Sequence, residues 1–226
     1  MLEIKKYAAI DIGSNAIRLL ISNVIIDNDK EPQFKKSSLV RVPIRLGADA
    51  FVSGSISKEN IGRMTDAMKA FNLLMKVHGV EKHKACATSA MREATNGQEV
   101  VQIILEKTGI EIDVIDGKKE AAIIFSTDLS ELIESDQSYL YVDVGGGSTE
   151  FTIFSKGRII NSKSFKMGTV RLMNNSKSEN KVIFKEVQHW IEENTKNIKK
   201  ISLIGSGGNI NKLFKMSGRT IGKPIS

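Results

Sequence analysis

Short apolar runs open the chain and alternate with polar turns, a pattern that predicts strands. Two runs, Tyr7–Ile12 and Arg18–Ile26, have the length and composition of strands and are joined by a polar turn at residues 13–15. Lys36–Leu46 is rich in β-branched residues and is predicted as a third strand. The chain is therefore expected to begin with three consecutive strands.

The apolar positions then change to the helical period. They predict an amphipathic helix that ends near His78 and has Ser57 as its N-cap: Ile61, Met64, Met68, Phe71, Leu74 and Met75. A second helix is predicted from Gly97 to Thr108, and Gly109 is well placed as its C-terminal cap.

Further short elements complete the first half of the chain. Lys84–Thr88 and Ile110–Ile115 are predicted as strands, with residues 89–96 as a turn between the first of them and the second helix. Glu120–Leu132 is predicted as a helix that joins the two halves. This mixture of strands and helices indicates an α/β lobe, which we place at residues 1–125.

The second half repeats this order of elements. Three strands, Tyr139–Val144, Glu150–Ser155 and Arg158–Lys166, are predicted to form a meander with a hairpin turn at residues 156–157. A polar loop at residues 174–180, a helix at 182–198, a strand at 201–204 and a glycine turn at 205–209 that opens a helix at Ile210 follow. We place this second lobe at residues 126–226, and it is expected to lack the closing strand and helix of the first.

Composition restricts the class of protein and its partners. Of 226 residues, 41% are hydrophobic and 26% are charged, as in ordinary soluble globular proteins. No signal-peptide pattern and no apolar run of about 20 residues is found, and the single Cys86 excludes an internal disulfide. We therefore expect a cytoplasmic protein with no membrane partner.

The net charge of +7 points to anionic partners, although lysine-rich surfaces also serve solubility alone. Aromatic residues make up only 6% of the chain and are not interleaved with basic residues, and no zinc-finger spacing occurs. Nucleic acid is therefore not expected as a partner. A phosphate-rich small molecule or polymer fits the charge better.

Two glycine turns, each preceded by a carboxylate at a strand end, carry the chemistry. Asp11 precedes the turn Gly13-Ser14-Asn15, and Asp143 precedes Gly145-Gly146-Gly147-Ser148. Glycine lets backbone N–H groups approach an anion closely, so each turn is a candidate phosphate site. Asp143 either accepts hydrogen bonds within its turn or holds Mg²⁺, and the position beside a phosphate site favours the metal.

Other candidate residues have both a structural and a catalytic interpretation. Glu120 either interacts with the helix dipole or orients a water for attack on a phosphoryl group. Glu150 is either a solvent-facing strand residue or part of the site. Arg18 and Arg92 each follow a turn and suit bidentate phosphate recognition, unless they are ordinary surface residues. The chain has no Gly-x-x-x-x-Gly-Lys-Ser/Thr motif and no evident catalytic triad.

Seven segments spread along the chain carry a recognisable set of motifs: Ala9–Leu19, Arg45–Gly47, Ala87–Asn96, Asp116–Ala121, Val142–Glu150, Lys166–Leu172 and Gly205–Gly208. Together they resemble the exopolyphosphatase / guanosine pentaphosphate phosphohydrolase (Ppx/GppA) family of the actin-like ATPase superfamily. The combination of Ala-Thr-Ser-Ala-x-Arg, the Glu-Ala helix start and Gly-Gly-Gly-Ser-Thr-Glu is specific to this family.

The resemblance implies two actin-like (ribonuclease H-like) α/β lobes with mixed five-stranded sheets and an active site in the cleft between them. It implies that Glu120 activates water and that Asp143 and Glu150 serve the metal and the water, with Asp11 as a further metal ligand. The implied phosphate-binding residues are Gly13, Ser14, Asn15, Arg18, Arg92, Gly145, Gly146, Gly147, Ser148, Gly207 and Gly208.

The implied reaction is Mg²⁺-dependent (or Mn²⁺-dependent) removal of the terminal phosphate from inorganic polyphosphate. The alternatives are removal of the 5′-γ-phosphate of guanosine pentaphosphate and a sensor that binds either ligand without turnover. A kinase of the same superfamily is disfavoured because Glu120 is retained. Family analogy implies a homodimer.

The chain departs from the family pattern at three points. Lys119 stands where the family usually has the first of two glutamates, and Asn209 stands where it usually has threonine. Family members also continue beyond the position of Ser226, which is why the second lobe is expected to be shortened.

Overall fold

The computed structural model describes residues 2–27, 30–124 and 136–219, which fall into two compact units. The units are residues 1–115 and 116–226. Helix α5 (Gly117–Ile124) contacts strands β7 (Thr149–Ser155) and β8 (Arg158–Phe165) and therefore belongs to the second unit. The expected lobe boundary after residue 125 would have left this helix in the first.

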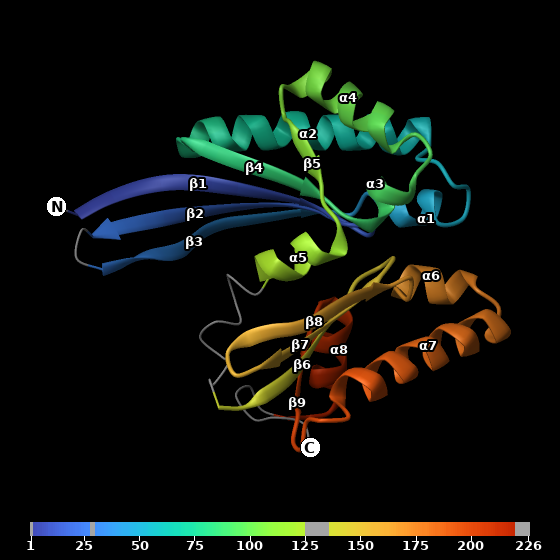
Figure 1. The fold of residues 1–226 in the computed structure, drawn as a ribbon. Coiled ribbons are helices and arrows are strands. Elements are labelled where there is room, and N and C mark those ends of the chain that lie inside the picture. Colours follow the sequence, from blue (N-terminus) through green and yellow to red (C-terminus); the bar gives the residue numbers. More distant parts are fainter. Residues whose placement is uncertain (1, 28–29, 125–135, 220–226) are drawn as a thin grey trace. The chain divides into compact units, whose positions relative to one another are not determined.

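The first unit contains a mixed five-stranded sheet with the order β3-β2-β1-β4-β5 (Figure 1). Its strands are β1 (Leu2–Ile12), β2 (Ile17–Asp27), β3 (Lys30–Val42), β4 (Lys82–Ala87) and β5 (Ile112–Val114). β1, β2 and β3 pair antiparallel, whereas β4 pairs parallel with both β1 and β5. Each strand predicted in this half of the chain is present, although β1 and β3 begin earlier than expected.

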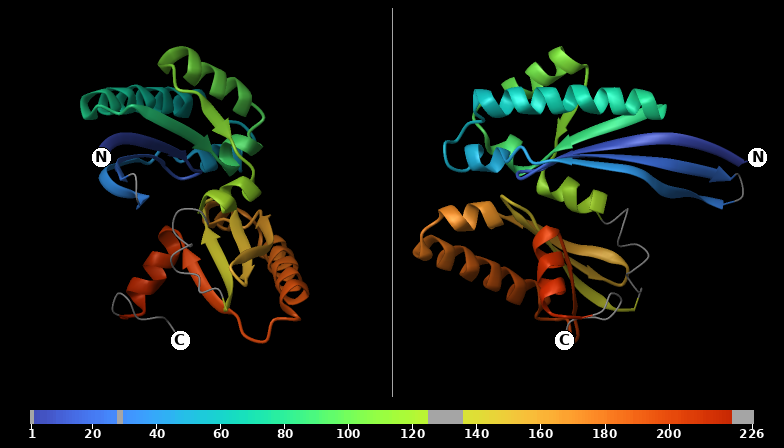
Figure 2. Two further views of the ribbon diagram at one scale, coloured as in Figure 1. Left: turned by 60° about the vertical axis from the view of Figure 1, so that its left-hand side comes forward. Right: turned by 180° about the vertical axis from the view of Figure 1, so that it is seen from behind.

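Two long helices, α2 (Lys58–His78) and α4 (Gly97–Thr108), pack over one face of this sheet (Figures 1 and 2). The core between them is apolar because alternate strand residues such as Ile10 meet the helical stripe that contains Phe71. The predicted caps are confirmed. The Ser57 side chain accepts a hydrogen bond from Asn60 N at 3.3 Å, and Gly109 has the left-handed conformation with φ 72°.

Two one-turn helices in this unit were not predicted; a strand and a turn were expected in their place. The expected third strand was to run to residue 46, but β3 ends at Val42 and α1 (Leu46–Ala50) follows. Residues 89–96 were expected to be a turn, but α3 (Ser89–Glu93) occupies their first half. Helices of one turn are too short to show a hydrophobic period, and these two are defined by the burial of small or apolar side chains.

The second unit contains a four-stranded mixed sheet in the described residues, with the order β8-β7-β6-β9. It consists of β6 (Ser138–Val144), β7, β8 and β9 (Ser202–Ser206). β6, β7 and β8 form the predicted antiparallel meander, and β9 pairs parallel with β6. This is the order of the first four strands of the other sheet, so both units have the expected actin-like α/β architecture, the second with four described strands rather than five.

The helices in the described part of the second unit are α6 (Thr169–Asn174), α7 (Lys177–Thr195) and α8 (Gly208–Met216), besides α5. The expected loop at residues 174–180 is wrong in its second half, because α7 begins at Lys177. A reciprocal capping box fixes this start: Ser176 Oγ accepts from Glu179 N, and the Glu179 carboxylate accepts from Ser176 N at 2.7 Å. The Ser-x-x-Glu pattern was visible in the sequence.

An aromatic cluster forms the core of the second unit. Phe151 of β7, Phe165 of β8 and Trp190 of α7 meet edge to face, with ring centroids 5.5–6.3 Å apart. Because strand side chains alternate, Glu150 and Ser164 project from the opposite face of the sheet. Helix α7 therefore covers the face that carries these aromatic rings. The opposite face carries Glu150 and Ser164, and further along the strands a second buried cluster of Tyr139, Tyr141 and Phe154.

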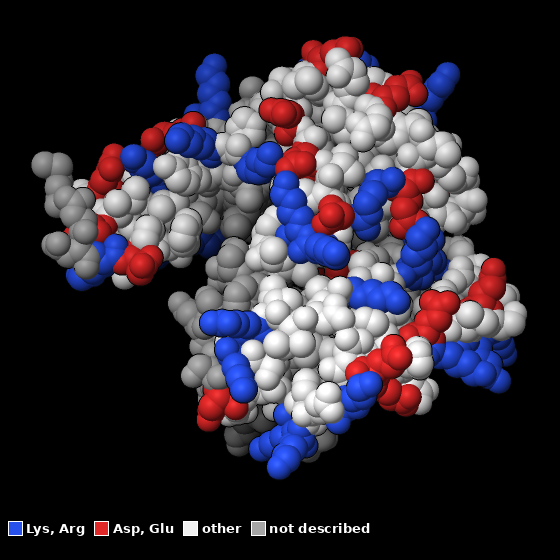
Figure 3. Space-filling view, viewed as in Figure 1, with Lys and Arg blue, Asp and Glu red and all other residues white. Residues whose placement is uncertain are grey.

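Charged side chains of both signs are interspersed over the face shown in Figure 3. Among the residues that the structure describes, no helix has the length and apolar content needed to cross a bilayer.

Candidate active site

A row of polar side chains crosses the second sheet near the tip of its central hairpin. Asp143 on β6 lies opposite Glu150 on β7, which in turn lies opposite Ser164 on β8. On the other side, Asp143 is in register with Ser206 on β9. Residues in register share one face of a sheet, so two carboxylates stand side by side with a hydroxyl at each end.

Glu150 is a buried carboxylate held by hydroxyl groups. Only 3% of the residue is exposed, and its Oε1 accepts hydrogen bonds from Ser148 Oγ at 2.6 Å and Ser164 Oγ at 2.9 Å. A buried carboxylate is tolerated when such donors satisfy it. These contacts fix Glu150 in one position and exclude the interpretation that it is an ordinary solvent-facing strand residue.

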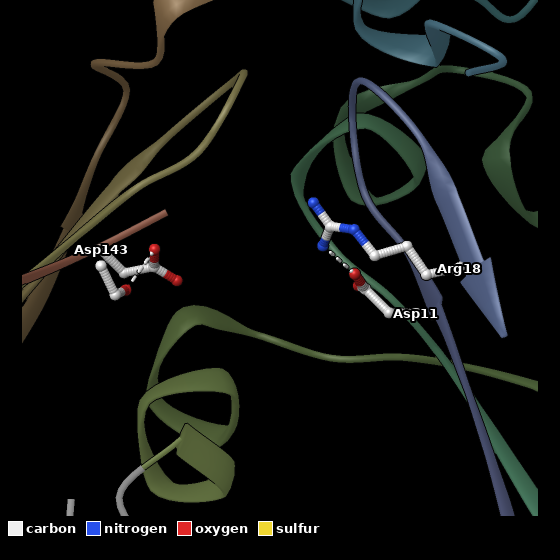
Figure 4. Close-up of polar contacts among 4 residues, drawn as sticks. Asp11, Arg18 and Asp143 are labelled. Carbon is white, nitrogen blue, oxygen red and sulfur yellow. Dashed lines mark hydrogen bonds and ion pairs between the residues drawn. The ribbon is translucent and has the colours of Figure 1, made fainter. Parts of the chain in front are cut away.

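Asp143 is positioned by a relay of two hydroxyl groups. Tyr141 Oη donates to Ser206 Oγ at 2.6 Å. Ser206 Oγ in turn donates to Asp143 Oδ1 at 2.7 Å, and Figure 4 shows the bond to Asp143. The third glycine turn passes directly beside this carboxylate. A Cβ on Gly207 would lie 2.7 Å from Val144 O and 3.1 Å from Asp143 Oδ1, and its φ of 97° also favours glycine.

The start of α6 supports the glycine turn at residues 145–147 from behind. Thr169 N and Val170 N donate to the carbonyls of Gly145 and Gly146 at 3.1 and 2.8 Å. Arg171 Nε donates to the carbonyl of Gly147 at 2.9 Å. All three carbonyls of the turn are thus directed toward α6.

The direction of these carbonyls determines that of the adjacent N–H groups. In a planar trans peptide the C=O and the following N–H point opposite ways, so the N–H groups of residues 146, 147 and 148 are directed away from α6. Among the described residues, Gly146 N and Gly147 N donate no hydrogen bond. Successive N–H groups presented in this way have the arrangement of a nest, a backbone geometry that can accept an anion.

Helix α5 packs on the face of the same sheet that carries Glu150 and Ser164. Asp116 Oδ1 accepts from Lys119 N at 2.8 Å and caps the helix start. Gly117 lies so close to β8 that a Cβ there would be 2.7 Å from the Cβ of Ser164. Glu120 is one turn further along and therefore on the same helix face as Gly117, and its Oε2 is inaccessible to solvent.

The corresponding turn of the first unit is built differently. Asp11 Oδ2 accepts from Arg18 Nη1 at 2.6 Å, so this carboxylate is neutralised within its own unit (Figure 4). Ser14 is buried, and its Oγ shares a 2.9 Å hydrogen bond with Ser89 Oγ. Gly13 N closes the turn on Ala16 O at 3.1 Å.

Other predicted phosphate ligands occupy contrasting environments. Arg92 is half-buried on α3, and its Nη1 donates to Ile115 O at 2.7 Å, which attaches the end of β5 to this helix. Asn15 is exposed at the tip of its turn, and Gly208 is exposed as the first residue of α8. The structure thus collects Glu120, the carboxylate pair and the triple-glycine turn in one unit.

Several supporting residues were not predicted as part of the site: Ser164, Ser206, Tyr141, Gly117 and the segment Gly168–Arg171. The motif Lys166–Leu172 was visible, but nothing in the sequence connected it to the turn at residues 145–147. The connection depends on β8 returning the chain to that turn.

Comparison with known proteins identifies the family. A model of the Ppx/GppA phosphatase family matches residues 25–214. The chain belongs to the Ppx/GppA phosphatase family. It is 31% identical over 172 residues to exopolyphosphatase 2 of Mycobacterium tuberculosis, covering 74% of this chain and 53% of that protein. It is 34% identical over 219 residues to a bifunctional 3-dehydroquinate synthase/phosphatase of Fusobacterium nucleatum, covering 89% of this chain and 32% of that protein. The chain thus spans about half the length of these relatives or less.

Solved structures agree with this family membership. The crystal structure of an exopolyphosphatase from Cytophaga hutchinsonii superposes with a TM-score of 0.82 at 30% identity, over 94% of this chain and 70% of that one. A family member from Aquifex aeolicus, at 24% identity and a TM-score of 0.73 over 98% of this chain and 72% of that one, has the same fold.

Proposed function

We propose that this protein is an exopolyphosphatase, which hydrolyses the terminal phosphoanhydride of inorganic polyphosphate with a water activated by Glu120. The observation that carries the proposal is the packing of α5 on β8. Gly117 touches Ser164, and the same Ser164 hydroxyl holds Glu150 beside Asp143. A general base, a carboxylate pair and an anion nest therefore belong to one rigid set of contacts.

Each part of the set has a role in phosphoryl transfer. The N–H groups of Gly146 and Gly147 bind non-bridging oxygens of the terminal phosphate, where negative charge accumulates. Glu120 accepts the proton of the attacking water. Its Oε2 is inaccessible to solvent. Glu150, fixed by its serines, orients this water by accepting its second hydrogen bond.

The carboxylate pair fits Mg²⁺ or Mn²⁺. Two carboxylates in register repel each other unless a cation or hydrogen-bond donors offset the charge. In the described part of the chain no three His, Cys, Asp or Glu side chains are grouped tightly enough to hold a metal. Magnesium is commonly held by one or two carboxylates together with substrate phosphates, which matches Asp143 and Glu150. When bound, the metal would neutralise charge on the phosphates. Asp11, already paired with Arg18, is the weaker candidate for a ligand.

The proposal is tested by Glu120→Gln with Glu99→Gln as a matched control. Glu99 is an exposed glutamate in the first turn of α4, so the control makes the same substitution in the first turn of a helix in the other unit. We expect Glu120→Gln to lower kcat for phosphate release from long-chain polyphosphate by about 10²–10⁴-fold, with polyphosphate affinity retained. Glu99→Gln should match the wild type.

Three outcomes would count against parts of the proposal. Full activity in Glu120→Gln would remove this residue from the mechanism. Faster phosphate release from guanosine pentaphosphate than from polyphosphate would favour the nucleotide as the substrate. Tight binding of polyphosphate without any release would favour a sensor.

A further inference from the structure

Arg45 has a backbone conformation that arginine rarely adopts. Its φ and ψ of 65° and 41° lie in the left-handed region, which costs a residue with a Cβ about 1–2 kcal/mol. Among the described residues, only Lys156 shares a positive φ without being glycine. A conformation of this kind persists only where the surrounding structure enforces it, and such residues are concentrated at functional sites.

The two cases have different explanations. Lys156 and Gly157, with φ of 52° and 68°, form the two-residue turn between β7 and β8, and the common hairpin turn requires a positive φ at both positions. Arg45 lies between β3 and α1 and belongs to no hairpin. Glycine would adopt this backbone conformation without strain. The presence of arginine here therefore points to a role for its side chain.

Arg45 lies in a corner of the chain, residues 43–45 between β3 and α1, that is anchored by burial and hydrogen bonds. Its neighbours Ile44 and Leu46 are almost completely buried, with 2% and 0% exposed. Arg63 of α2 donates to the carbonyls of Pro43 at 2.9 Å and Ile44 at 3.2 Å. The segment is therefore anchored on both sides of Arg45, and the left-handed conformation is the one that these anchors allow.

The corner is also bonded to the turn at residues 13–15. Arg45 N donates to Asn15 O at 2.9 Å, and Gly47 N donates to Ser14 O at 2.7 Å. Gly47 approaches so closely that a Cβ there would lie 3.0 Å from the Cβ of Ser14. Arg45 is thus a fixed neighbour of the predicted phosphate turn of the first unit.

The Arg45 side chain is exposed and makes no hydrogen bond or ion pair with a described residue. Arg18 pairs with a carboxylate, and Arg63, Arg92 and Arg171 donate to backbone carbonyls. Arg41 and Arg158 are also exposed without a side-chain partner among the described residues, but neither has the strained backbone of Arg45. This strained corner therefore presents an exposed guanidinium, with no partner among the described residues, beside the predicted phosphate turn.

We propose that Arg45 is a specificity-determining residue whose guanidinium binds non-bridging oxygens of the substrate's phosphate chain. Guanidinium pairs with phosphate through two parallel hydrogen bonds, which Lys cannot reproduce. The inference rests on the proposed function and extends it. Arg45 is not among the groups proposed to act on the scissile bond, so it contributes to binding of the phosphate chain and acts on KM rather than kcat.

The test compares Arg45→Gly with Lys156→Gly in the full chain. Each variant removes one positive charge and one left-handed residue that carries a Cβ, so the two are matched in net charge and backbone change. Because glycine relieves the strain but increases the freedom of the unfolded chain, both should melt at or slightly above the wild-type temperature. Only Arg45→Gly should raise the KM for polyphosphate, by about tenfold or more, because the charge-assisted hydrogen bonds of the guanidinium are lost, with kcat within about twofold.

Arg45→Lys separates charge from geometry, because it keeps the charge and the strained backbone but loses the planar fork. We expect its KM to lie between the wild-type value and that of Arg45→Gly. The proposal is overturned if Arg45→Gly leaves KM unchanged, if Lys156→Gly raises KM equally, or if Arg45→Gly melts well below the wild type.

The outcome is separable from that of the proposed function. If the wild-type protein releases no phosphate, the exopolyphosphatase proposal fails, and calorimetric titration with tripolyphosphate then tests Arg45 directly. Weaker binding to Arg45→Gly than to Lys156→Gly would support the inference, and equal binding would refute it.

Discussion

Replacing Gly168 with Ala should displace the glycine turn without touching any group proposed to react. Gly168 has φ −110° and ψ 161°, which alanine adopts freely, so the substitution adds only a methyl group. That methyl carbon would lie 2.2 Å from the Gly146 carbonyl carbon and 2.3 Å from Gly147 N, far shorter than the 3.0 Å below which Cβ contacts essentially never occur. Restoring ordinary contact requires the two backbone segments to separate by about 1 Å.

The size of the effect follows from this displacement. Overpacking of this kind typically costs about 1–3 kcal/mol of folding free energy, and we expect a melting temperature several degrees below the wild type. The N–H groups of the nest would move by a similar distance relative to Glu150. A misplacement of about 1 Å costs about 10²-fold in rate, so kcat/KM for polyphosphate should fall by this factor.

The assay is phosphate release from polyphosphate, with thermal unfolding of the same samples. Gly62→Ala in α2 is the control, because a Cβ there would have no heavy atom within 4 Å. That substitution should leave kcat/KM unchanged and stabilise the helix by up to about 1 kcal/mol. If Gly168→Ala keeps wild-type activity and stability, the reasoning that α6 positions the turn is refuted.

Two further predictions concern hydrogen bonds to carboxylates. Ser164→Ala should lower kcat about tenfold with little change in KM, because it removes a donor to Glu150 Oε1 and loosens the orientation of the attacking water, and steady-state kinetics would show this. Asp49→Ala should destabilise the protein by about 1–2 kcal/mol at pH 7 in urea unfolding. Burial raises the pKa of Asp49, but hydrogen bonds from Ser57 and Asn60 outweigh it and lower the pKa below 3.8. The stabilisation is therefore complete above pH 3.8 and is lost as the pH falls through the folded pKa, so the difference between wild type and variant should shrink in acid.

The long elements were predictable because their hydrophobic period and end signals agree. The stripe of α2 and the glycine after α4 identified both helices and their caps. Elements of one turn were not predictable, since α1 and α3 are too short for a period to appear. The segment of α7 that begins at Lys177 was missed because its polar composition resembles a loop, although its capping box was present.

The candidate site was predictable in part, and the division has a physical cause. A carboxylate at a strand end followed by consecutive glycines is a local pattern typical of phosphate and metal sites. Asp143 and the turn at residues 145–147 could therefore be predicted from the sequence. Ser164 and Ser206 are ordinary residues until strand register sets them beside Glu150 and Asp143. The role of Gly168 depends on a close backbone approach, which no local pattern reveals.

The position of Trp190 gives the protein an internal optical probe. It is the only tryptophan of the chain, and it is 8% exposed against Phe151 and Phe165. Its fluorescence therefore reports on the second unit alone, whereas circular dichroism reports on the helices of both. Coincident denaturation curves from the two signals would mean that the units unfold in a single cooperative step, and separate curves would mean that each unit has a stability of its own.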